Sequence, residues 1–227
     1  MERIKKKYLN WVLGLSKKRS RQGLYEFLAT EFSKIPSHSK VLTVGAGGEV
    51  NDLLDQHAKL QNFECLSFDI DITRDPDLLG DICDYNFQPS SFDTVVMSEV
   101  LEHLHSPKQG VSNVYKTLKP SGVLILSTPF ILPIHDQPHD YFRFTRYGLA
   151  LLLKDFNSIK INERNSYFEA IDVLWVRLLQ ANLRSAKYAS LIVIPVIFFL
   201  KRPLSILLSK LIPTDSMTTG YVVTATK

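Results

Sequence analysis

Cysteine is scarce in this 227-residue chain, which has only Cys65 and Cys83. Both lie in apolar segments, and their spacing matches no metal-binding motif. The composition therefore excludes a disulfide-rich scaffold, and two free, buried thiols fit a reducing compartment. We expect a cytoplasmic protein.

A long uncharged apolar run is also missing. The nearest approach is Leu191 to Leu200, which is too short to cross a bilayer and contains Pro195. The chain is 45% hydrophobic and 22% charged, as in ordinary folded proteins, so extensive disorder is excluded. The length suits a single domain with a sizeable core.

Acidic residues are nearly absent from residues 1–21, where Glu2 is the single acid. Lysines and arginines in this segment surround an apolar group, Trp11 to Leu15. The segment is too short and too interrupted for a signal peptide. We treat residues 1–21 as a basic amphipathic N-terminal segment. It either contacts anionic lipid or nucleic acid, or forms a solvated helix leading into the fold.

A helix-prone apolar segment occupies residues 171–212. Lys201, Arg202 and Pro203 are expected to end its first helix, and a second begins at Leu204. One interpretation is a helical hairpin on a membrane surface, at the inner face of the cytoplasmic membrane. The other is a cap on the main fold or a homodimer interface. The residues expected near lipid phosphates are Arg177, Arg184, Lys187, Lys201, Arg202 and Lys210.

Short apolar runs alternate with amphipathic segments, a pattern typical of α/β proteins with a parallel sheet. The predicted strands are Val41–Val44, Phe63–Phe68, Phe92–Met97, Val123–Leu126, Phe156–Ile161 and Tyr221–Thr226. The predicted helices cover residues 22–34, 49–57, 99–104, 110–118 and 145–153, with a turn at 120–122. Ligand sites are then expected beyond the carboxyl ends of the strands.

The first predicted strand ends in a glycine turn, Gly45-Ala46-Gly47-Gly48. Glycine allows left-handed backbone angles and close ligand approach, and the next helix begins with free N–H groups. Such a turn suits a nucleotide, a phosphate or a carboxylate. Asp69 ends the second strand, where its carboxylate can accept hydrogen bonds from ribose hydroxyls. No arginine follows in a place suited to a 2′-phosphate, which leaves NADP unsupported.

Six motifs in order extend this pattern, and with them the chain resembles class I S-adenosylmethionine-dependent methyltransferases. The similarity is to the methyltransferase type 11-like subgroup, often found with bacterial surface-polysaccharide genes, and covers residues 40–153. It implies a Rossmann-like, seven-stranded, mostly parallel sheet with helices on both faces. The methyltransferase domain would span 22–227, with the apolar insertion 171–212 before the last strand. The motifs are VLTVGAGGE, SFDID, GDICDYNF, SFDTVVMSEVLEHL, LKPSGVLILSTPF and HDQPHDYFRFTRYGL.

The resemblance also implies contacts with S-adenosylmethionine. The glycine turn would pass under the methionine and ribose, and the end of the second strand would hold the ribose. The acid Asp81 would contact the adenine, and the end of the third long strand would line the site beside the methionine. The residues implied are Gly45, Ala46, Gly47, Asp69, Ile70, Asp81, Ile82, Met97 and Ser98. Two departures concern the fine geometry. Thr43 replaces a usual acid and would reach the cofactor through water, and Glu49 replaces a third glycine and would cap the helix.

Glu99, Glu102 and His103 would share one face of a helix just past a strand end. One interpretation is a site for Mg²⁺ or Mn²⁺ completed by His135 or His139, similar to that of small-RNA 2′-O-methyltransferases and ubiquinone-pathway O-methyltransferases. The other is a metal-free site in which His103 or His139 is the catalytic base.

The segment from His139 to Thr145 follows a proline-rich loop. It is expected either to close over the substrate or to serve as a helix entry with Thr145 as N-cap. Arg143 would bind an anionic group of the substrate, and His135 and Tyr141 would also face it.

These observations predict an O-methyltransferase acting on a sugar hydroxyl of a glycan or lipid-linked glycan. The alternatives are an O-methyltransferase of a quinone-like lipid, a small molecule or RNA, and a non-catalytic membrane-associated binding module. Nucleic acid is disfavoured because the basic residues cluster with apolar ones rather than lining a groove.

Overall fold

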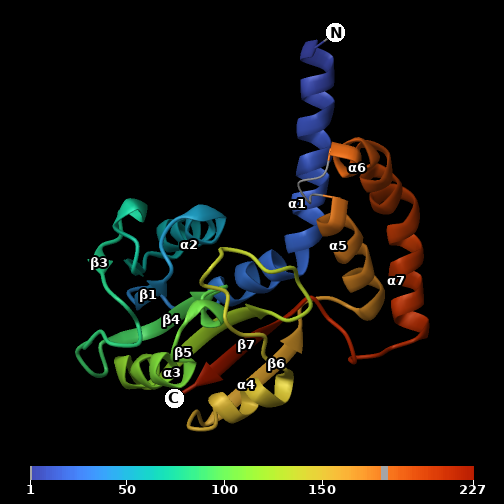
Figure 1. Cartoon of the computed structure of the whole chain (residues 1–227). Coiled ribbons are helices and arrows are strands. Elements are labelled where there is room, and N and C mark those ends of the chain that lie inside the picture. The colour runs from blue at the N-terminus through green and yellow to red at the C-terminus, as the bar shows by residue number, and fades with distance from the viewer. Residues whose placement is uncertain (1, 180–183) are drawn as a thin grey trace. The chain divides into compact units, whose positions relative to one another are not determined.

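The computed structural model describes residues 2–179 and 184–227, and the chain divides into two units (Figure 1). We call them the helical unit and the sheet unit and describe each by itself. The helical unit consists of Met1–Leu24, Ile131–Pro133 and Glu163–Thr219. The sheet unit consists of Tyr25–Phe130, Ile134–Asn162 and Gly220–Lys227.

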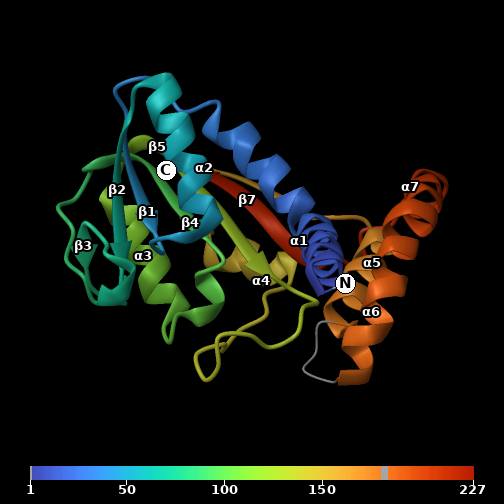
Figure 2. The same ribbon diagram turned by 90° about the horizontal axis from the view of Figure 1, so that it is seen from above.

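The sheet unit is built on seven strands in the order β3-β2-β1-β4-β5-β7-β6 (Figure 2). From β3 to β5 neighbouring strands are parallel, and β7 is antiparallel to β5. The predicted Rossmann-like, mostly parallel sheet is confirmed. The strands are β1 (Lys40–Val44), β2 (Glu64–Asp69), β3 (Leu78–Leu79), β4 (Phe92–Ser98), β5 (Leu118–Pro129), β6 (Ser158–Glu163) and β7 (Gly220–Thr226).

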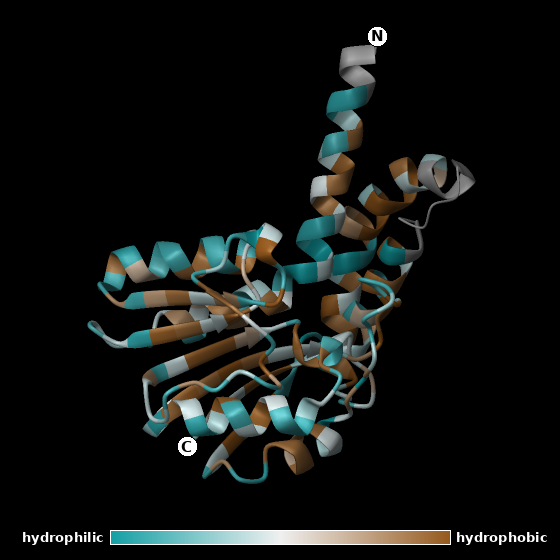
Figure 3. Cartoon of the chain, turned by 60° about the vertical axis from the view of Figure 1, so that its left-hand side comes forward, coloured by the Kyte–Doolittle hydropathy of each residue, from teal (hydrophilic) through white to brown (hydrophobic). Residues whose placement is uncertain are grey.

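Helices cover both faces of this sheet, with α2 on one side and α3 and α4 on the other (Figure 1). The central strands are apolar along their length, whereas the covering helices alternate polar and apolar residues (Figure 3). Val95 and Met97 of β4 and Leu124 and Leu126 of β5 are fully buried in one core. The α-helices are α2 (Gly48–Gln61), α3 (Pro107–Thr117) and α4 (Arg146–Leu152), and the 3₁₀ helices are η1 (Ile72–Arg74) and η2 (Leu101–His103).

Two local predictions in this unit are wrong. The helix expected over 99–104 is a single 3₁₀ turn, because Glu99 takes a left-handed φ of 56° and hydrogen-bonds Ser127 through its N–H. The turn expected at 120–122 lies inside β5 as an irregularity: the register moves from Phe92↔Leu118 to Thr94↔Val123. The two-residue β3 has no apolar run long enough to predict it.

The helical unit contains the first part of α1 (Glu2–Phe32), α5 (Tyr167–Leu179), α6 (Arg184–Val196), the π-helix η3 (Ile197–Lys201) and α7 (Arg202–Leu211). The C-terminal apolar helical segment is confirmed, but the helix end predicted at Lys201–Pro203 is wrong. α6, η3 and α7 follow without a break. Pro203 costs this continuous helix one backbone hydrogen bond without ending it, and Lys201 is neutralised by the buried carboxylate of Asp172.

Candidate active site

The glycine turn lies at the carboxyl end of β1 in a conformation that needs glycine. Gly45, Gly47 and Gly48 have φ values of 94°, 77° and 76°. A Cβ on Gly45 would lie 2.9 Å from the Val100 side chain, whereas one on Gly47 or Gly48 would meet no atom within 4 Å. The turn is therefore packed on one side and open above its last two glycines, which lead into the N-terminus of α2.

Asp69 closes the turn from the end of β2. Its Oδ2 accepts a hydrogen bond from the Ala46 N–H at 2.6 Å, and its Oδ1 accepts one from the Asp71 N–H at 2.8 Å. A carboxylate has about four acceptor positions, so two remain for ribose hydroxyls. The side chain is 8% exposed, so only a small part of it is accessible to a ligand.

Arg74 is a residue of this site that the sequence did not reveal. Its guanidinium donates to the Ala46 carbonyl at 3.2 Å and lies 3.8 Å from the carboxylates of Asp69 and Asp71. An arginine therefore does lie at the ribose end, although the sequence analysis expected none suited to a 2′-phosphate there. The only sequence signal was its position five residues after Asp69. Two carboxylates surround this arginine, so little of its charge is left for a 2′-phosphate.

Asn51 also braces the turn. With its amide oriented to satisfy both atoms, it donates to the Gly45 carbonyl at 3.2 Å and accepts from the Gly47 N–H at 3.1 Å. Thr43 lies beside Asn51 and is buried. The N-cap of α2 is Gly47, without a side-chain cap, and Glu49 accepts a hydrogen bond from Tyr25.

The residues expected around the adenine lie near the ends of β2 and β3. Asp81 accepts from the Cys83 N–H at 2.8 Å, and its second oxygen lies 3.5 Å from His105. Ile70 is exposed, whereas Ile82 is buried in the core. Ile82 therefore offers a ligand little side-chain surface, and Ile70 offers an open apolar one.

The floor of the site is formed at the end of β4. Met97 is fully buried, and Ser98 and Ser127 share a hydrogen bond of 2.9 Å between their hydroxyls. Ser127 also donates to Glu99 at 3.0 Å. These contacts turn the Glu99 side chain toward β5.

A polar cluster of Glu102, His103 and His135 lies beyond the same strand end. Glu102 is fully buried; its Oε2 accepts from Thr128 at 3.4 Å, and its Oε1 has no hydrogen-bond partner among the described residues. That oxygen is 3.7 Å from His103 Nε2 and 3.6 Å from His135 Nε2. A buried carboxylate oxygen without a hydrogen bond destabilises the fold. The Glu102 oxygen therefore favours a positive charge beside it, either a proton on one of the two imidazoles or a bound cation.

His103 is held in one tautomer. Its Nδ1 lies 2.7 Å from the backbone carbonyl of His139, which can only accept, so Nδ1 carries the proton and Nε2 is left basic. The His139 ring instead bonds the Tyr141 hydroxyl at 2.8 Å. Of the two histidines predicted as catalytic bases, His103 has its geometry fixed and His139 is exposed.

The pKa values in the cluster shift in the directions that this geometry implies. Burial raises the pKa of Glu102. The nearby Glu102 carboxylate raises the pKa of His135, burial lowers it, and Asp140 and Asp136 add to the increase.

Arg143 is committed to an internal partner rather than pointing freely at a substrate. It donates to both oxygens of Asp140, from Nη1 to Oδ1 and from Nη2 to Oδ2, the second at 2.6 Å. This pairing lowers the pKa of Asp140 to about 2. Asp140 also accepts from the His135 N–H at 3.0 Å, so the pair positions His135. Thr145 caps α4 by accepting from the Gly148 N–H, as predicted.

Two groups of side chains among the described residues have ligand atoms close enough to share a metal ion. They are Glu102, His103 and His135, and Asp81, Cys83 and His105. The predicted set of Glu99, Glu102, His103 and His139 is brought together only in part. The Glu99 carboxylate accepts from Ser127, the His139 ring bonds Tyr141, and His135 stands in the third position. Whether a metal binds stays a prediction.

Comparison with known proteins agrees with this geometry. Residues 42–126 match the family described as "Methyltransferase domain". No curated protein matches the chain. A structure of a SAM-dependent methyltransferase from Archaeoglobus fulgidus is similar with a TM-score of 0.58 and 16% identity, over 92% of this chain and 94% of that one.

A second similar structure is phosphoethanolamine N-methyltransferase 2 of Haemonchus contortus, bound to phosphomonomethylethanolamine and S-adenosylhomocysteine. The TM-score is 0.57 at 16% identity, over 91% of this chain. This chain spans about half of that protein, 52% of its length. A third is a putative methyltransferase of Haloferax volcanii in complex with the activator Trm112, with a TM-score of 0.55 and 13% identity, over 96% of each chain.

Structures at such low identity establish the fold, and the family match covers the segment from β1 into β5 that carries the glycine turn, Asp69 and Ser98. The family match shows a methyltransferase domain over residues 42–126, and the fold of the chain is that of known S-adenosylmethionine-dependent methyltransferases.

Proposed function

We propose that the chain transfers the methyl group of S-adenosylmethionine to a hydroxyl group of a sugar, on a glycan or a lipid-linked glycan. The observation that carries the proposal is that two features lie at neighbouring strand ends. One is the glycine turn, which Asp69 braces and which has free space above its last two glycines; the other is the cluster of Glu102, His103 and His135. The glycine turn suits binding of a nucleoside, and the cluster suits deprotonation of an acceptor.

The turn fits the cofactor on its own features. Space is open above Gly47 and Gly48, Asp69 has acceptor positions left for ribose hydroxyls, and α2 begins with free N–H groups. Ile70 offers an exposed apolar side chain for the adenine. When bound, S-adenosylmethionine supplies an electrophilic methyl group on a sulfonium sulfur.

His103 acts as the general base in this proposal. Its neutral form presents Nε2 to the acceptor hydroxyl and takes the proton as the new C–O bond forms. The adjacent Glu102 carboxylate stabilises the imidazolium that results. Most of the rate gain would come from holding the hydroxyl in line with the departing sulfur, which is a matter of position.

The choice of a sugar acceptor rests on the resemblance to the subgroup associated with surface polysaccharides. The similar worm enzyme is an N-methyltransferase by name, so an amine acceptor is the rival to exclude. The arginine expected to bind an anionic acceptor is engaged by Asp140, which favours a neutral polyol over a phosphate or carboxylate at that position.

Calorimetry with S-adenosylhomocysteine tests the cofactor part first. We expect a single site per chain, and no binding would refute the enzyme assignment in favour of a non-catalytic module. Release of S-adenosylhomocysteine is then measured over lipid-linked sugars, free sugars, quinols and phosphoethanolamine. Turnover with the sugars supports the proposal. Turnover with the amine or quinol alone would contradict it.

A further inference from the structure

The long apolar helix of the helical unit has its apolar face outward. Most of the exposed large apolar residues of α6, η3 and α7 recur every three or four positions and form one continuous stripe, while Ile206 is exposed outside this series. We call these residues the apolar stripe: Tyr188, Ile192, Val196, Phe199, Leu200, Leu204, Leu207 and Leu211. A helix of a soluble protein normally turns such a stripe toward the core.

The opposite side of the same helix faces inward and is partly polar. Ser190 and Ser205 are buried there, next to Ile194 and Ile197. Ser209, one turn beyond Ser205, hydrogen-bonds Ser166 at 2.6 Å. The helix therefore buries hydroxyls while it exposes leucine, isoleucine and phenylalanine.

A buried ionic cluster holds this orientation. Arg19 of α1 donates to Glu169 and Asp172 of α5, each at 3.1 Å, and Lys201 pairs with Asp172 on its other oxygen. Arg202 donates to Gln22 at 2.9 Å. Because removing one partner of a buried pair is costly, the helix cannot rotate to bury its stripe.

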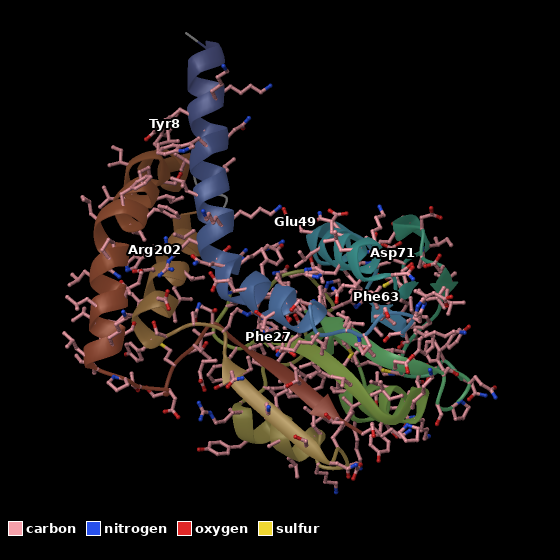
Figure 4. All side chains as sticks on the ribbon, turned by 180° about the vertical axis from the view of Figure 1, so that it is seen from behind. Tyr8, Phe27, Glu49, Phe63, Asp71 and Arg202 are labelled. Carbon is pink, nitrogen blue, oxygen red and sulfur yellow. The ribbon has the colours of Figure 1, made fainter. Side chains whose placement is uncertain are left out.

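The start of α1 extends the exposed apolar surface. Trp11 stacks on Phe199 of the stripe with ring centroids 6.1 Å apart, and the Tyr8 hydroxyl donates to the Leu191 carbonyl at 2.7 Å. Figure 4 labels Tyr8 on α1. Trp11 and Tyr8 are both more than 40% exposed. Tryptophan and tyrosine are the side chains enriched where apolar and aqueous phases meet.

The helix that carries the stripe has charges of one sign only. Residues 184–212 contain no acidic residue, and Lys210 is exposed near their end. Lys6, Lys7, Lys17 and Lys18 of α1 are also exposed. An apolar face bordered by lysines complements a surface that is apolar inside and anionic at its edge.

We propose that the helical unit docks on a lipid bilayer containing anionic lipids. The apolar stripe enters the interface between headgroups and acyl chains, and the α1 lysines meet the headgroups. Docking does not depend on methyl transfer.

Two other arrangements fit less well. Tyr188–Leu211 is long and apolar enough to span a membrane by length and composition, but Lys201 and Arg202 fall near its middle and belong to the ionic cluster. Spanning would carry those charges into the hydrocarbon. A second copy docked through the stripe would bring lysines against lysines.

Vesicle co-sedimentation of the full chain tests docking. We expect binding to vesicles of phosphatidylcholine with phosphatidylglycerol, weaker binding to phosphatidylcholine alone, and a decrease at high salt. The double variant Leu204→Glu, Leu207→Glu should bind at least about tenfold more weakly, because two leucines no longer leave water. The matched controls are Leu60→Glu and Leu151→Glu, on leucines of the sheet unit that are even more exposed, and they should bind as the wild type does.

Trp11 gives a second, spectroscopic readout. The chain has two tryptophans, so Trp175→Phe leaves Trp11 alone. Its emission should shift to the blue on adding anionic vesicles and be quenched by lipids brominated near the headgroup.

Folding of every variant is checked by thermal melting and by calorimetry with S-adenosylhomocysteine. Three results would overturn the proposal. They are no binding of the wild type to either kind of vesicle, equal binding by the wild type and the stripe variant, and a wild type that is a dimer in light scattering while the stripe variant is a monomer.

Discussion

The carboxylate of Asp69 at the end of β2 holds the Ala46 N–H of the glycine turn at 2.6 Å. This contact joins the ends of two neighbouring parallel strands at the proposed cofactor site. It makes one residue both a brace for the turn and the candidate ligand for a ribose.

Replacing Asp69 with asparagine should separate these two roles. Asn keeps the shape and one acceptor oxygen but loses the charge, and a hydrogen bond to a charged group contributes about 1.5–3 kcal/mol. We expect the Kd for S-adenosylhomocysteine to rise about tenfold to a hundredfold by calorimetry. Asp71→Asn, two residues on and largely exposed, is the control. Unchanged affinity in Asp69→Asn would remove the ribose assignment.

Alanine at Gly45 and Gly47 should have different consequences. Both positions need a left-handed φ, which costs an alanine about 1–2 kcal/mol. At Gly45 the new Cβ would also lie 2.9 Å from Val100, whereas at Gly47 it would point into open space. Chemical denaturation should therefore show the larger loss of stability for Gly45→Ala.

For the affinity for S-adenosylhomocysteine, we expect Gly47→Ala to have the larger effect of the two variants. Gly47→Ala places a methyl group where the cofactor is proposed to pass, so it should weaken S-adenosylhomocysteine binding while the protein remains folded. The pair Gly45→Ala, Val100→Ala relieves the clash and is the control for packing. Normal binding by Gly47→Ala would mean that the ligand does not approach this glycine.

Much of the fold was predictable because apolar runs at Val41–Val44, Phe92–Met97 and Val123–Leu126 correspond to buried strands. The glycine turn and Asp69 were proposed from their positions at strand ends, whereas the other proposed cofactor residues came from the resemblance to methyltransferases. What could not be predicted depended on tertiary contacts. Lys201 and Pro203 signalled a helix end, yet a buried Asp172 from another helix neutralises the lysine.

The cluster proposed to bind the acceptor also depends on tertiary contacts that the sequence pattern does not reveal. A regular helix would have aligned Glu99 with Glu102 and His103, but the left-handed backbone at Glu99 breaks that periodicity. His135 reaches the cluster from a loop whose path is fixed by Asp140, and loop paths have no periodic sequence signal.

Glu102→Gln should lower the pKa of His135. The Glu102 carboxylate is the largest cause that raises this pKa, so removing its charge should lower the pKa even though Asp140 and Asp136 remain. NMR of the imidazole protons measures the change, with His135→Gln assigning the signal. Asp136→Asn, on an exposed carboxylate, should produce a smaller decrease. A His135 pKa that is unchanged in Glu102→Gln would contradict the close approach of the two side chains.

His103→Asn should abolish most methyl transfer without weakening cofactor binding. The asparagine amide can still donate to the His139 carbonyl, but it cannot take a proton. A general base contributes about 10²- to 10⁴-fold, so kcat should fall by that order while the Kd for S-adenosylhomocysteine is unchanged. His139→Ala keeps the backbone carbonyl and should lose far less.

Removing metal ions with a chelator distinguishes a mechanism with His103 as the general base from one that needs a bound metal ion. With His103 as the base, turnover should survive EDTA. Loss of turnover in EDTA and its recovery with Mg²⁺ or Mn²⁺ would instead assign Glu102, His103 and His135 as metal ligands.

Asp140→Asn should reduce stability clearly at neutral pH and much less in acid. The Arg143 pair lowers the pKa of Asp140 from 3.8 to about 2, and a lowered carboxyl pKa stabilises the fold above the unfolded value. That stability, about 2 kcal/mol at pH 7, is lost as the pH falls from about 4 toward 2. Denaturation at pH 7 and at pH 2.5 measures the difference, and Asp136→Asn on the same loop is the control. Equal effects of Asp140→Asn at both pH values would show that its carboxylate is not held by Arg143.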